Sequence, residues 1–133
     1  MSGDQGFGTA TAYLYTLSEI VKNTQVTDHN GAVLSLDEGA EQAVRMILSA
    51  GVISRKIMLV CHGGSAAIVS HMHNDICKAV GMRGLVFTEQ PLLTALANDD
   101  GYEAAFEHSV QLWAEPNDLM LAISSSGKSE NIL

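Results

Sequence analysis

Two short turns rich in glycine and serine carry the residues best suited to hold an anion. Residues 61–65 read Cys-His-Gly-Gly-Ser, and residues 124–129 read Ser-Ser-Ser-Gly-Lys-Ser. Each turn follows an apolar run that predicts a buried strand and precedes a segment that predicts a helix. Backbone N–H groups at a helix start and serine hydroxyls both donate hydrogen bonds to anions. The two turns together predict one phosphate-sized anion held between two helix N-termini.

Each turn also has an ordinary structural interpretation. Gly63 and Gly64 allow a ligand to approach the backbone closely, and Ser65 places a hydroxyl at a helix start, but Gly-Gly-Ser is more often a tight connection. A serine-rich run caps a helix about as often as it binds an anion. The sequence contains no Gly-x-x-x-x-Gly-Lys-Ser/Thr and no Gly-x-Gly-x-x-Gly after a strand. These absences count against a nucleotide P-loop and a dinucleotide-binding fold.

A histidine and a carboxylate one helical turn apart form a second candidate site. His71 and Asp75 are four residues apart on an expected helix, so both project from one face and can bind one divalent metal or act on one substrate. A solvated His/Asp pair is the structural alternative, because zinc needs three or four protein ligands. His62 lies at the first turn, whereas His29 and His108 are expected at the surface.

A polar loop and two aromatic residues complete the candidates. Residues 98–102 read Asn-Asp-Asp-Gly-Tyr, which most often forms a capped loop between helices. If this loop folds toward the crevice, Asp99 can accept hydrogen bonds from sugar hydroxyls. Phe106 and Trp113 are expected in the core of the following helix.

Composition limits the kind of protein to which these residues belong. The 133 residues are 47% hydrophobic and 17% charged, which fits one compact α/β domain. A net charge of −8 with only seven Lys and Arg argues against direct binding of nucleic acid. No apolar run is long enough to span a membrane, and residues 1–6 lack the pattern of a secretion signal, so we expect a cytoplasmic protein. Cys61 and Cys77 are expected to be buried, reduced thiols.

The elements that position the candidates follow from hydrophobic periodicity. The expected helices cover about residues 13–21, from Ser35 or Asp37 to Gly51, 65–80, 91–96 and 102–113, with one turn of a last helix at 127–133. The expected strands cover residues 57–61, 85–87 and 119–123. This alternation predicts a parallel sheet with a ligand at the carboxyl ends of its strands, where both turns lie.

Three segments in register resemble a known family. Residues 61–67, 93–103 and 117–133 resemble the sugar isomerase (SIS) domain, and within it the phosphoheptose isomerase branch. The resemblance implies one SIS domain over residues 1–133, with a helical segment at about 9–52 and a βα core at about 56–133. It also implies an α/β three-layer sandwich with a parallel sheet of flavodoxin-like, Rossmann-type topology, preceded by the N-terminal helices.

The resemblance implies an activity and a set of partners. It indicates a cytoplasmic homotetramer that converts sedoheptulose 7-phosphate to D-glycero-D-manno-heptose 7-phosphate, an aldose–ketose isomerisation in heptose biosynthesis, with zinc as cofactor. A phosphorylated sugar is then the partner, and neither nucleic acid nor a membrane is. The alternative is a SIS-type module that binds a phosphosugar or another protein without catalysis.

The resemblance also assigns roles to individual residues. Asp75 is implied as the proton-transfer base, and His71 and Asp75 are implied as metal ligands. The residues implied to bind the substrate are His62, Gly63, Gly64, Ser65, Asp99, Ser124, Ser125, Ser126 and Ser129.

The chain departs from the family pattern at several positions. Cys61-His62 stands where the family has Gly-Asn, Lys128 where Asn is usual, and Asp75 where the family has Glu. The family also continues beyond the equivalent of Leu133, and that part supplies a histidine general acid and further histidine and glutamine metal ligands. We therefore expect this chain to lack the C-terminal part of the family fold. The retained pair His71 and Asp75 favours the enzyme, whereas Asp in place of Glu, His62 and the missing C-terminal acid favour the binding module.

Overall fold

The computed structural model describes residues 8–133, so the expectation for residues 1–6 lies outside them. Contacts divide the chain into two compact units, Met1–Val44 and Arg45–Leu133, and each unit is described by itself. Among the described residues, none of the helices has the length and apolar character needed to cross a membrane.

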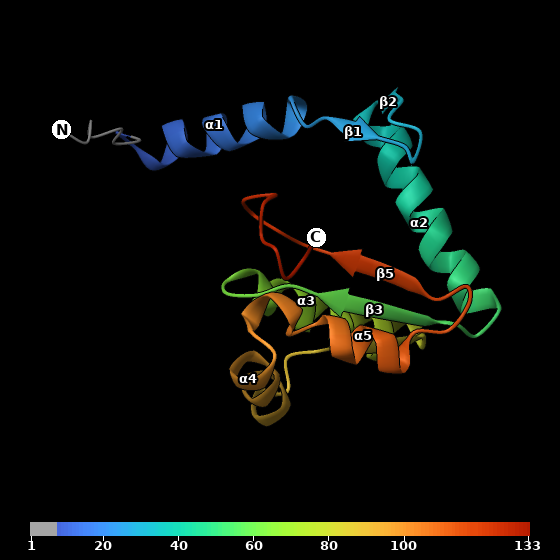
Figure 1. Ribbon diagram of the computed structural model, residues 1–133. Helices are drawn as coiled ribbons and strands as arrows, with labels where there is room; N and C mark the ends of the chain where they lie inside the picture. The colour runs from blue at the N-terminus through green and yellow to red at the C-terminus, as the bar shows by residue number, and fades with distance from the viewer. Residues whose placement is uncertain (1–7) are drawn as a thin grey trace. The chain divides into compact units, whose positions relative to one another are not determined.

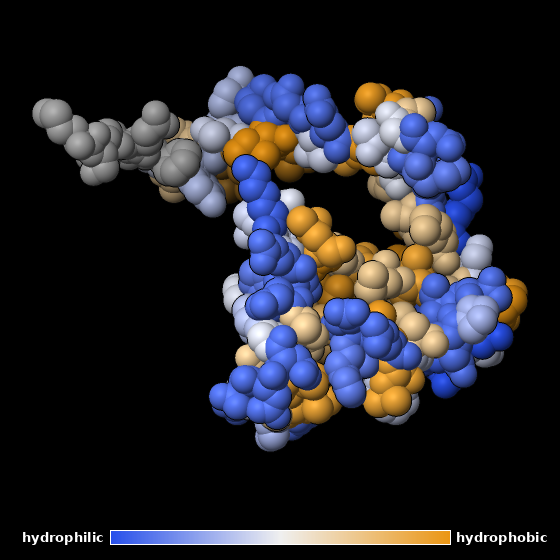
Figure 2. All heavy atoms as spheres, viewed as in Figure 1, coloured by the Kyte–Doolittle hydropathy of each residue, from blue (hydrophilic) through white to orange (hydrophobic). Residues whose placement is uncertain are grey.

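The first unit contains a helix and a short hairpin that precede the sheet. Helix α1 (Ala10–Lys22) begins at Thr9, whose hydroxyl accepts a hydrogen bond from the N–H of Ala12. No residue of α1 is buried, and its apolar side chains gather along one side of the helix (Figure 2). The periodicity that predicted this helix is therefore confirmed, although the unit leaves its apolar stripe uncovered.

The hairpin was not predicted from the sequence. Strands β1 (Val26–Thr27) and β2 (Val33–Leu34) pair in antiparallel fashion. A carboxylate oxygen of Asp28 accepts hydrogen bonds from the N–H groups of Asn30 and Ala32, at 2.9 and 2.8 Å. Such side-chain bonds to nearby backbone build a turn, so the Asp-His-Asn-Gly run was the signal that could have located it.

Helix α2 (Leu36–Val52) runs through the boundary between the units. Ser35 caps it as predicted, because the Ser35 hydroxyl accepts from the N–H of Glu38 while the Glu38 carboxylate accepts from the N–H of Ser35. The predicted stop at Gly51 is wrong by one residue. Ser54 instead adopts the left-handed conformation that ends the helix, at φ +56°.

A three-stranded parallel sheet organises the second unit, as predicted. Strand β3 (Lys56–Val60) lies between β4 (Arg83–Val86) and β5 (Leu119–Ala122). Helix α3 (Ser65–Asn74) continues into a π-helical turn, η1 (Asp75–Val80), whereas the sequence predicted one uniform helix there. After β4 come α4 (Gln90–Asp99), the 3₁₀ turn η2 (Tyr102–Ala104) and α5 (Glu107–Trp113) (Figure 1).

The core of this unit is built on both faces of β3. Ile57, Leu59 and Cys61 alternate along one face and pack with Val69 of α3 and Ile76 of η1. Met58 and Val60 lie on the other face, where Val60 and Phe106 line one cavity. Since every residue of β3 is buried, its uninterrupted apolar run is explained by helices on both faces of the sheet.

Three predictions within this unit are corrected. The single helix expected over residues 102–113 is broken, because the chain bends where Ala105 and Phe106 are buried, at 1% and 3% exposure. Trp113 is 51% exposed, so it is not a core residue as Phe106 is. The helix expected from residue 127 is one isolated turn, in which the N–H groups of Ile132 and Leu133 bond to the carbonyl of Ser129.

The two cysteines differ from each other. Both are free thiols, as predicted. Cys61 is buried, and burial raises the pKa of its thiol. Cys77 is exposed, so the prediction of burial is wrong for it, and its thiol donates to the carbonyl of Gly84 in β4 at 3.8 Å.

Candidate anion-binding site

The sheet brings the two glycine- and serine-rich turns side by side. Val60 pairs with Ala122 at the ends of β3 and β5, and the N–H of Ile123 donates to the carbonyl of Val60 at 3.0 Å. Neighbouring strands lie about 5 Å apart, so the two segments that follow leave the same edge of the sheet together. The sequence predicted this adjacency from the alternation of strands and helices.

The first turn opens helix α3 without a side-chain cap. Gly63 has a φ of +60°, a conformation that favours glycine, whereas Gly64 has an ordinary helical φ of −62°. A Cβ at either glycine would meet no atom within 4 Å, so the space above the turn is open. Helix α3 begins at the half-buried Ser65 after the N-cap Gly64, which has no side chain to cap it, and the N–H groups of Ala66 and Ala67 donate to the carbonyls of Gly63 and Gly64 at 3.1 and 3.3 Å. These N–H groups are the usual donors of a helix start to an anion.

The second turn gathers three hydroxyls, which we call the serine triangle: Ser124, Ser126 and Ser129. Oγ of Ser124 lies 3.0 Å from Oγ of Ser129 and 3.4 Å from that of Ser126, and the last two are 3.3 Å apart. The N–H of Lys128 also donates to Oγ of Ser126 at 3.1 Å. Ser125 is exposed and lies outside the triangle.

This arrangement is suited to an anion with several oxygens. Each hydroxyl can rotate its proton toward a ligand, and the hydrogen bonds within the serine triangle would be exchanged for stronger bonds to a charged oxygen. Gly127, at φ +64°, turns the backbone inside the loop, and a Cβ there would meet nothing within 4 Å. A phosphate group matches both the donors and the open space.

An aromatic pair borders the first turn. The ring of His62 lies 6.3 Å from the ring of Tyr102, with an interplanar angle of 57°. Tyr102 stands three residues after Asp99, so this pair brings the polar loop toward the first turn. Sequence reasoning did not select Tyr102, although an aromatic residue directly after Asp-Asp-Gly was the available signal.

The structure places Asp99 at the last position of α4. Its carboxylate accepts a hydrogen bond from the side chain of Asn98 at 2.8 Å. Within residues 8–133, Asp99 has no hydrogen bond to either glycine- and serine-rich turn. Its role toward a sugar therefore stays a prediction.

The side chains of His71 and Asp75, which form the second candidate site, lie close to each other. Nε2 of His71 lies 3.5 Å from Oδ2 of Asp75, with the two side chains 79% and 54% exposed. Asp75 sits at the junction of α3 and η1. In the part of the chain that the structure describes, no three His, Cys, Asp or Glu side chains come together as metal ligands. The described residues supply two ligands where zinc needs three or four, so they do not form a complete zinc site.

A polar cluster at the opposite edge of the sheet was missed. Lys56, at the start of β3, bonds with its ammonium to Glu115 at 2.5 Å and to Asp118 at 3.0 Å. Asp118 also accepts from the N–H groups of Lys56 and Glu115, both at 2.8 Å. A lysine next to a continuous apolar strand was the signal, because a buried lysine needs a partner.

The charged groups of this cluster change one another's pKa values. The hydrogen bond to Glu115 raises the pKa of Lys56 above its usual value, although burial acts to lower it. Burial acts to raise the pKa of Asp118, but its hydrogen bonds from the two N–H groups and from Lys56 outweigh burial and lower that pKa. The hydrogen bond from Lys56 likewise lowers the pKa of Glu115.

The fold and the site define an α/β protein whose parallel sheet carries two glycine- and serine-rich turns at its carboxyl edge. The chain belongs to the SIS domain family, which matches residues 24–133. This membership confirms the family that the three sequence segments resemble.

Several relatives are phosphoheptose isomerases. That of Akkermansia muciniphila is 31% identical over 125 residues, which cover 88% of this chain and 66% of that protein. That of Burkholderia pseudomallei is 35% identical over 112 residues, which cover 77% of this chain and 57% of that protein. The solved structure of phosphoheptose isomerase GmhA from Neisseria gonorrhoeae matches with a TM-score of 0.69 and 30% identity, covering 73% of this chain and 53% of that one. The chain thus spans about half to two thirds of the length of these relatives.

Proposed function

We propose that the chain holds the phosphate group of a sugar phosphate between the serine triangle and the start of α3. The observation that carries the proposal is the meeting of three hydroxyls, 3.0–3.4 Å apart, after a strand that pairs with the strand leading into α3. Gly63, Gly64 and Ser65 supply the first half of this site, with Ser125 at the rim of the second. His62 and Asp99 are the proposed contacts to the sugar.

We further propose that the bound sugar is sedoheptulose 7-phosphate and that the reaction is its isomerisation to an aldose. The phosphoheptose isomerases among the relatives support this substrate. Isomerisation moves a proton between C1 and C2 through an enediol, which needs a base near those carbons and an acid near the neighbouring oxygen. Asp75 is the proposed base. Its side chain is one methylene shorter than glutamate, so the position of C1 relative to α3 determines whether it reaches the proton.

The proposal assigns only two ligands to a zinc ion. A divalent metal polarises the substrate carbonyl in reactions of this kind. We propose His71 and Asp75 as two ligands of such an ion.

A specific observation also favours a second function, a phosphosugar-binding or regulatory module without catalysis. The phosphate half of the site is assembled, whereas His71 and Asp75 form an exposed pair with no third candidate ligand beside them among residues 8–133. A protein that binds the phosphate and leaves the sugar unchanged needs only the first half.

The resemblance supplies three further proposals. We propose that residues 1–133 belong to one SIS domain, that the protein assembles as a homotetramer, and that it works in the cytoplasm. Light scattering coupled to size-exclusion chromatography tests the assembly, and a particle of one chain's mass, about 14.1 kDa, would contradict it.

The test combines binding and turnover of sedoheptulose 7-phosphate. We expect saturable binding by calorimetry, weakened about tenfold by Ser126→Ala, because that change removes one hydroxyl donor to a charged group. Conversion of ketose to aldose, followed by ¹³C NMR with and without added zinc, then separates the two functions. Binding without conversion favours the module, and conversion that Asp75→Asn abolishes favours the isomerase.

Ser70→Ala is the matched control. Ser70 is an exposed serine on α3, away from both turns, so its hydroxyl has no part in the site. Equal losses of affinity in Ser126→Ala and Ser70→Ala would contradict the assignment of the serine triangle. Absence of any saturable binding by the wild-type chain would contradict both functions.

A further inference from the structure

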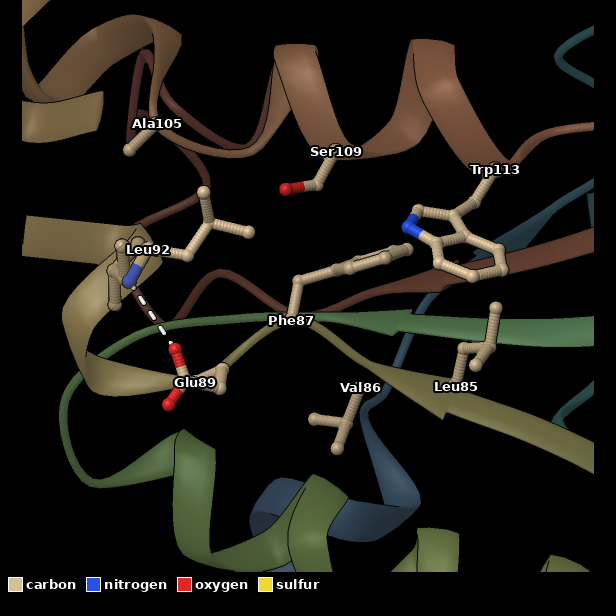
Figure 3. Close-up of a pocket in the computed structure, with 9 residues that line it drawn as sticks. Leu85, Val86, Phe87, Glu89, Leu92, Ala105, Ser109 and Trp113 are labelled. Atoms are coloured by element: carbon tan, nitrogen blue, oxygen red, sulfur yellow. Dashed lines mark hydrogen bonds between the residues drawn. The ribbon is translucent and has the colours of Figure 1, made fainter. Parts of the chain in front are cut away.

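A pocket in the second unit uses none of the residues proposed to hold the phosphate. It has a volume of about 200 Å³ and is enclosed by β4 with the residue after it, the start of α4, and α5 (Figure 3). Most of its wall is apolar. The apolar side chains of the wall, apart from the indole of Trp113, are those of Leu85, Val86, Phe87, Leu92, Leu93 and Ala105.

Ser109 is the polar residue whose position indicates a ligand in this pocket. It lies in the middle of α5, is only 4% exposed, and points its hydroxyl into the pocket (Figure 3). A serine inside a helix usually bonds back to the carbonyl four residues earlier, as Thr94 of α4 does. Across the described chain, the Ser109 hydroxyl has no such bond and no other hydrogen-bond partner. The Ser109 hydroxyl is therefore free to pair with whatever fills the pocket, whether water or the polar group of a ligand.

Trp113 places a second donor at the same space. Ser109 and Trp113 are four residues apart on α5, so they line one face of this helix toward the pocket, and Ala105 lines it from the turn before the helix. Figure 3 shows the indole nitrogen of Trp113 directed toward the ring of Phe87 and the space beside it. Within residues 8–133 this N–H has no hydrogen-bond partner. One hydroxyl that both donates and accepts and one N–H donor therefore face the same apolar space.

The remaining polar residue in the wall of the pocket is Glu89, which carries a carboxylate. Glu89 caps α4, and one of its oxygens accepts from the N–H of Leu92 at 3.1 Å. Its negative charge, in a chain of net charge −8, disfavours an anion in the pocket. Dry protein cavities of about 150 Å³ accommodate benzene, so about 200 Å³ fits one ring with one or two small substituents.

We propose that this pocket binds a small uncharged molecule with one aromatic ring and one hydroxyl, of the phenol class. The ring lies among the apolar side chains, and its hydroxyl donates to Oγ of Ser109, the polar atom that points into the pocket. The site is separate from the serine triangle, so it is a second ligand site on the same unit.

The experiment follows the Trp113 side chain directly, because it is the only tryptophan in the chain. Its indole N–H gives one cross-peak in a ¹H–¹⁵N spectrum of the full chain. We expect p-cresol to move this peak saturably, toluene to bind about fivefold more weakly because it lacks the hydroxyl, and benzoate to leave the peak unmoved because of Glu89. No saturable movement with p-cresol, or equal affinities for p-cresol and toluene, would overturn the proposal.

Two variants and a control locate the site. Ser109→Ala should weaken p-cresol about fivefold and leave the affinity for toluene unchanged, since only the hydroxyl contact is lost. Ala105→Leu should abolish binding of both by filling the space. His108→Ala changes an exposed neighbour on α5 and should leave both affinities unchanged. If Ala105→Leu fails to fold, the comparison of Ser109→Ala with the wild type still tests the proposal. Equal affinities of Ser109→Ala and the wild type for p-cresol would overturn the assignment of Ser109.

Discussion

The polar groups at the two ends of the β3–β5 strand pair have different kinds of hydrogen-bond partner. At the amino end, the side chain of Asp118 is 2% exposed and holds two N–H groups and the Lys56 ammonium. At the carboxyl end, the hydroxyls of the serine triangle bond to one another, and α3 starts without a side-chain cap. At the amino end an ion pair and backbone bonds join the strands, whereas at the carboxyl end hydroxyls that bond to one another can exchange those bonds for bonds to a charged ligand. We call these ends the closed edge and the open edge.

Removing Asp118 should have the largest effect on the closed edge. Asp118→Ala deletes the acceptor of two backbone N–H groups and one of the two carboxylate partners of the buried Lys56. Buried donors left without partners destabilise strongly, so we expect the melting temperature to fall by about 10 °C or more. Calorimetry measures this fall, and phosphosugar affinity measured well below the melting temperature should be unchanged.

Glu115→Ala is the matched comparison at the same edge. The Glu115 side chain is 54% exposed, and Lys56 keeps Asp118 when it is removed. We therefore expect a much smaller fall in melting temperature. Equal falls for the two variants, or a loss of ligand affinity with an intact fold, would contradict the separation of the two edges.

The closed edge should also be sensitive to acid. Because the folded-state pKa of Asp118 lies below its ordinary value of 3.8, its ionised form stabilises the fold. That contribution is complete above the unfolded-state pKa and is lost as the pH falls through the folded-state pKa. We expect Asp118→Asn to be less stable than the wild type at pH 7, with the difference shrinking below about pH 4. Urea unfolding at pH 7, 5, 4 and 3 measures the difference, and a constant gap would exclude this titration as its cause.

Substitutions of two adjacent glycines test the backbone conformation at the open edge. Gly63 has a φ of +60°, whereas Gly64 has −62°, and a Cβ at either meets no atom within 4 Å. Gly63→Ala should therefore cost about 1 kcal/mol of stability through backbone strain alone, and Gly64→Ala should cost nothing measurable. Urea unfolding compares the two variants. Equal stabilities would show that the turn relaxes without strain.

Sequence patterns located the open edge better than the closed edge. Glycine and serine signal a turn by their own backbone and side-chain chemistry, so residues 61–65 and 124–129 could be placed at strand ends and beside each other. The contacts of Lys56 with Glu115 and Asp118 join residues about sixty positions apart. No local pattern encodes such a pairing, and it was missed.

Tertiary burial explains the other differences from the sequence-based expectations. Helical spacing predicted one helix over residues 102–113, but burial of Ala105 and Phe106 bends the chain between η2 and α5. The same spacing placed Trp113 in the core, although α5 ends there with half of the side chain exposed. The roles of Asp99, His71 and Asp75 stay predictions, because they depend on where a bound sugar lies.

The closed edge retains two non-glycine residues at positive φ, Ser54 and Asn117, and relieving the first should produce the smallest effect. Ser54 stands two residues before β3 at φ +56°, where the N–H of Ser54 bonds to the carbonyl of Gly51 and that of Arg55 to Ala50. Ser54→Gly removes the strain of a side chain in this conformation, and the greater freedom of glycine in the unfolded chain offsets part of the gain. We expect a net stabilisation of about 0.5 kcal/mol in urea unfolding, with Ser54→Ala as control at or below wild-type stability. Because the carbonyl of Ser54 also accepts from Arg83 at 3.2 Å, a loss of stability in Ser54→Gly would show that the serine holds this backbone against β4.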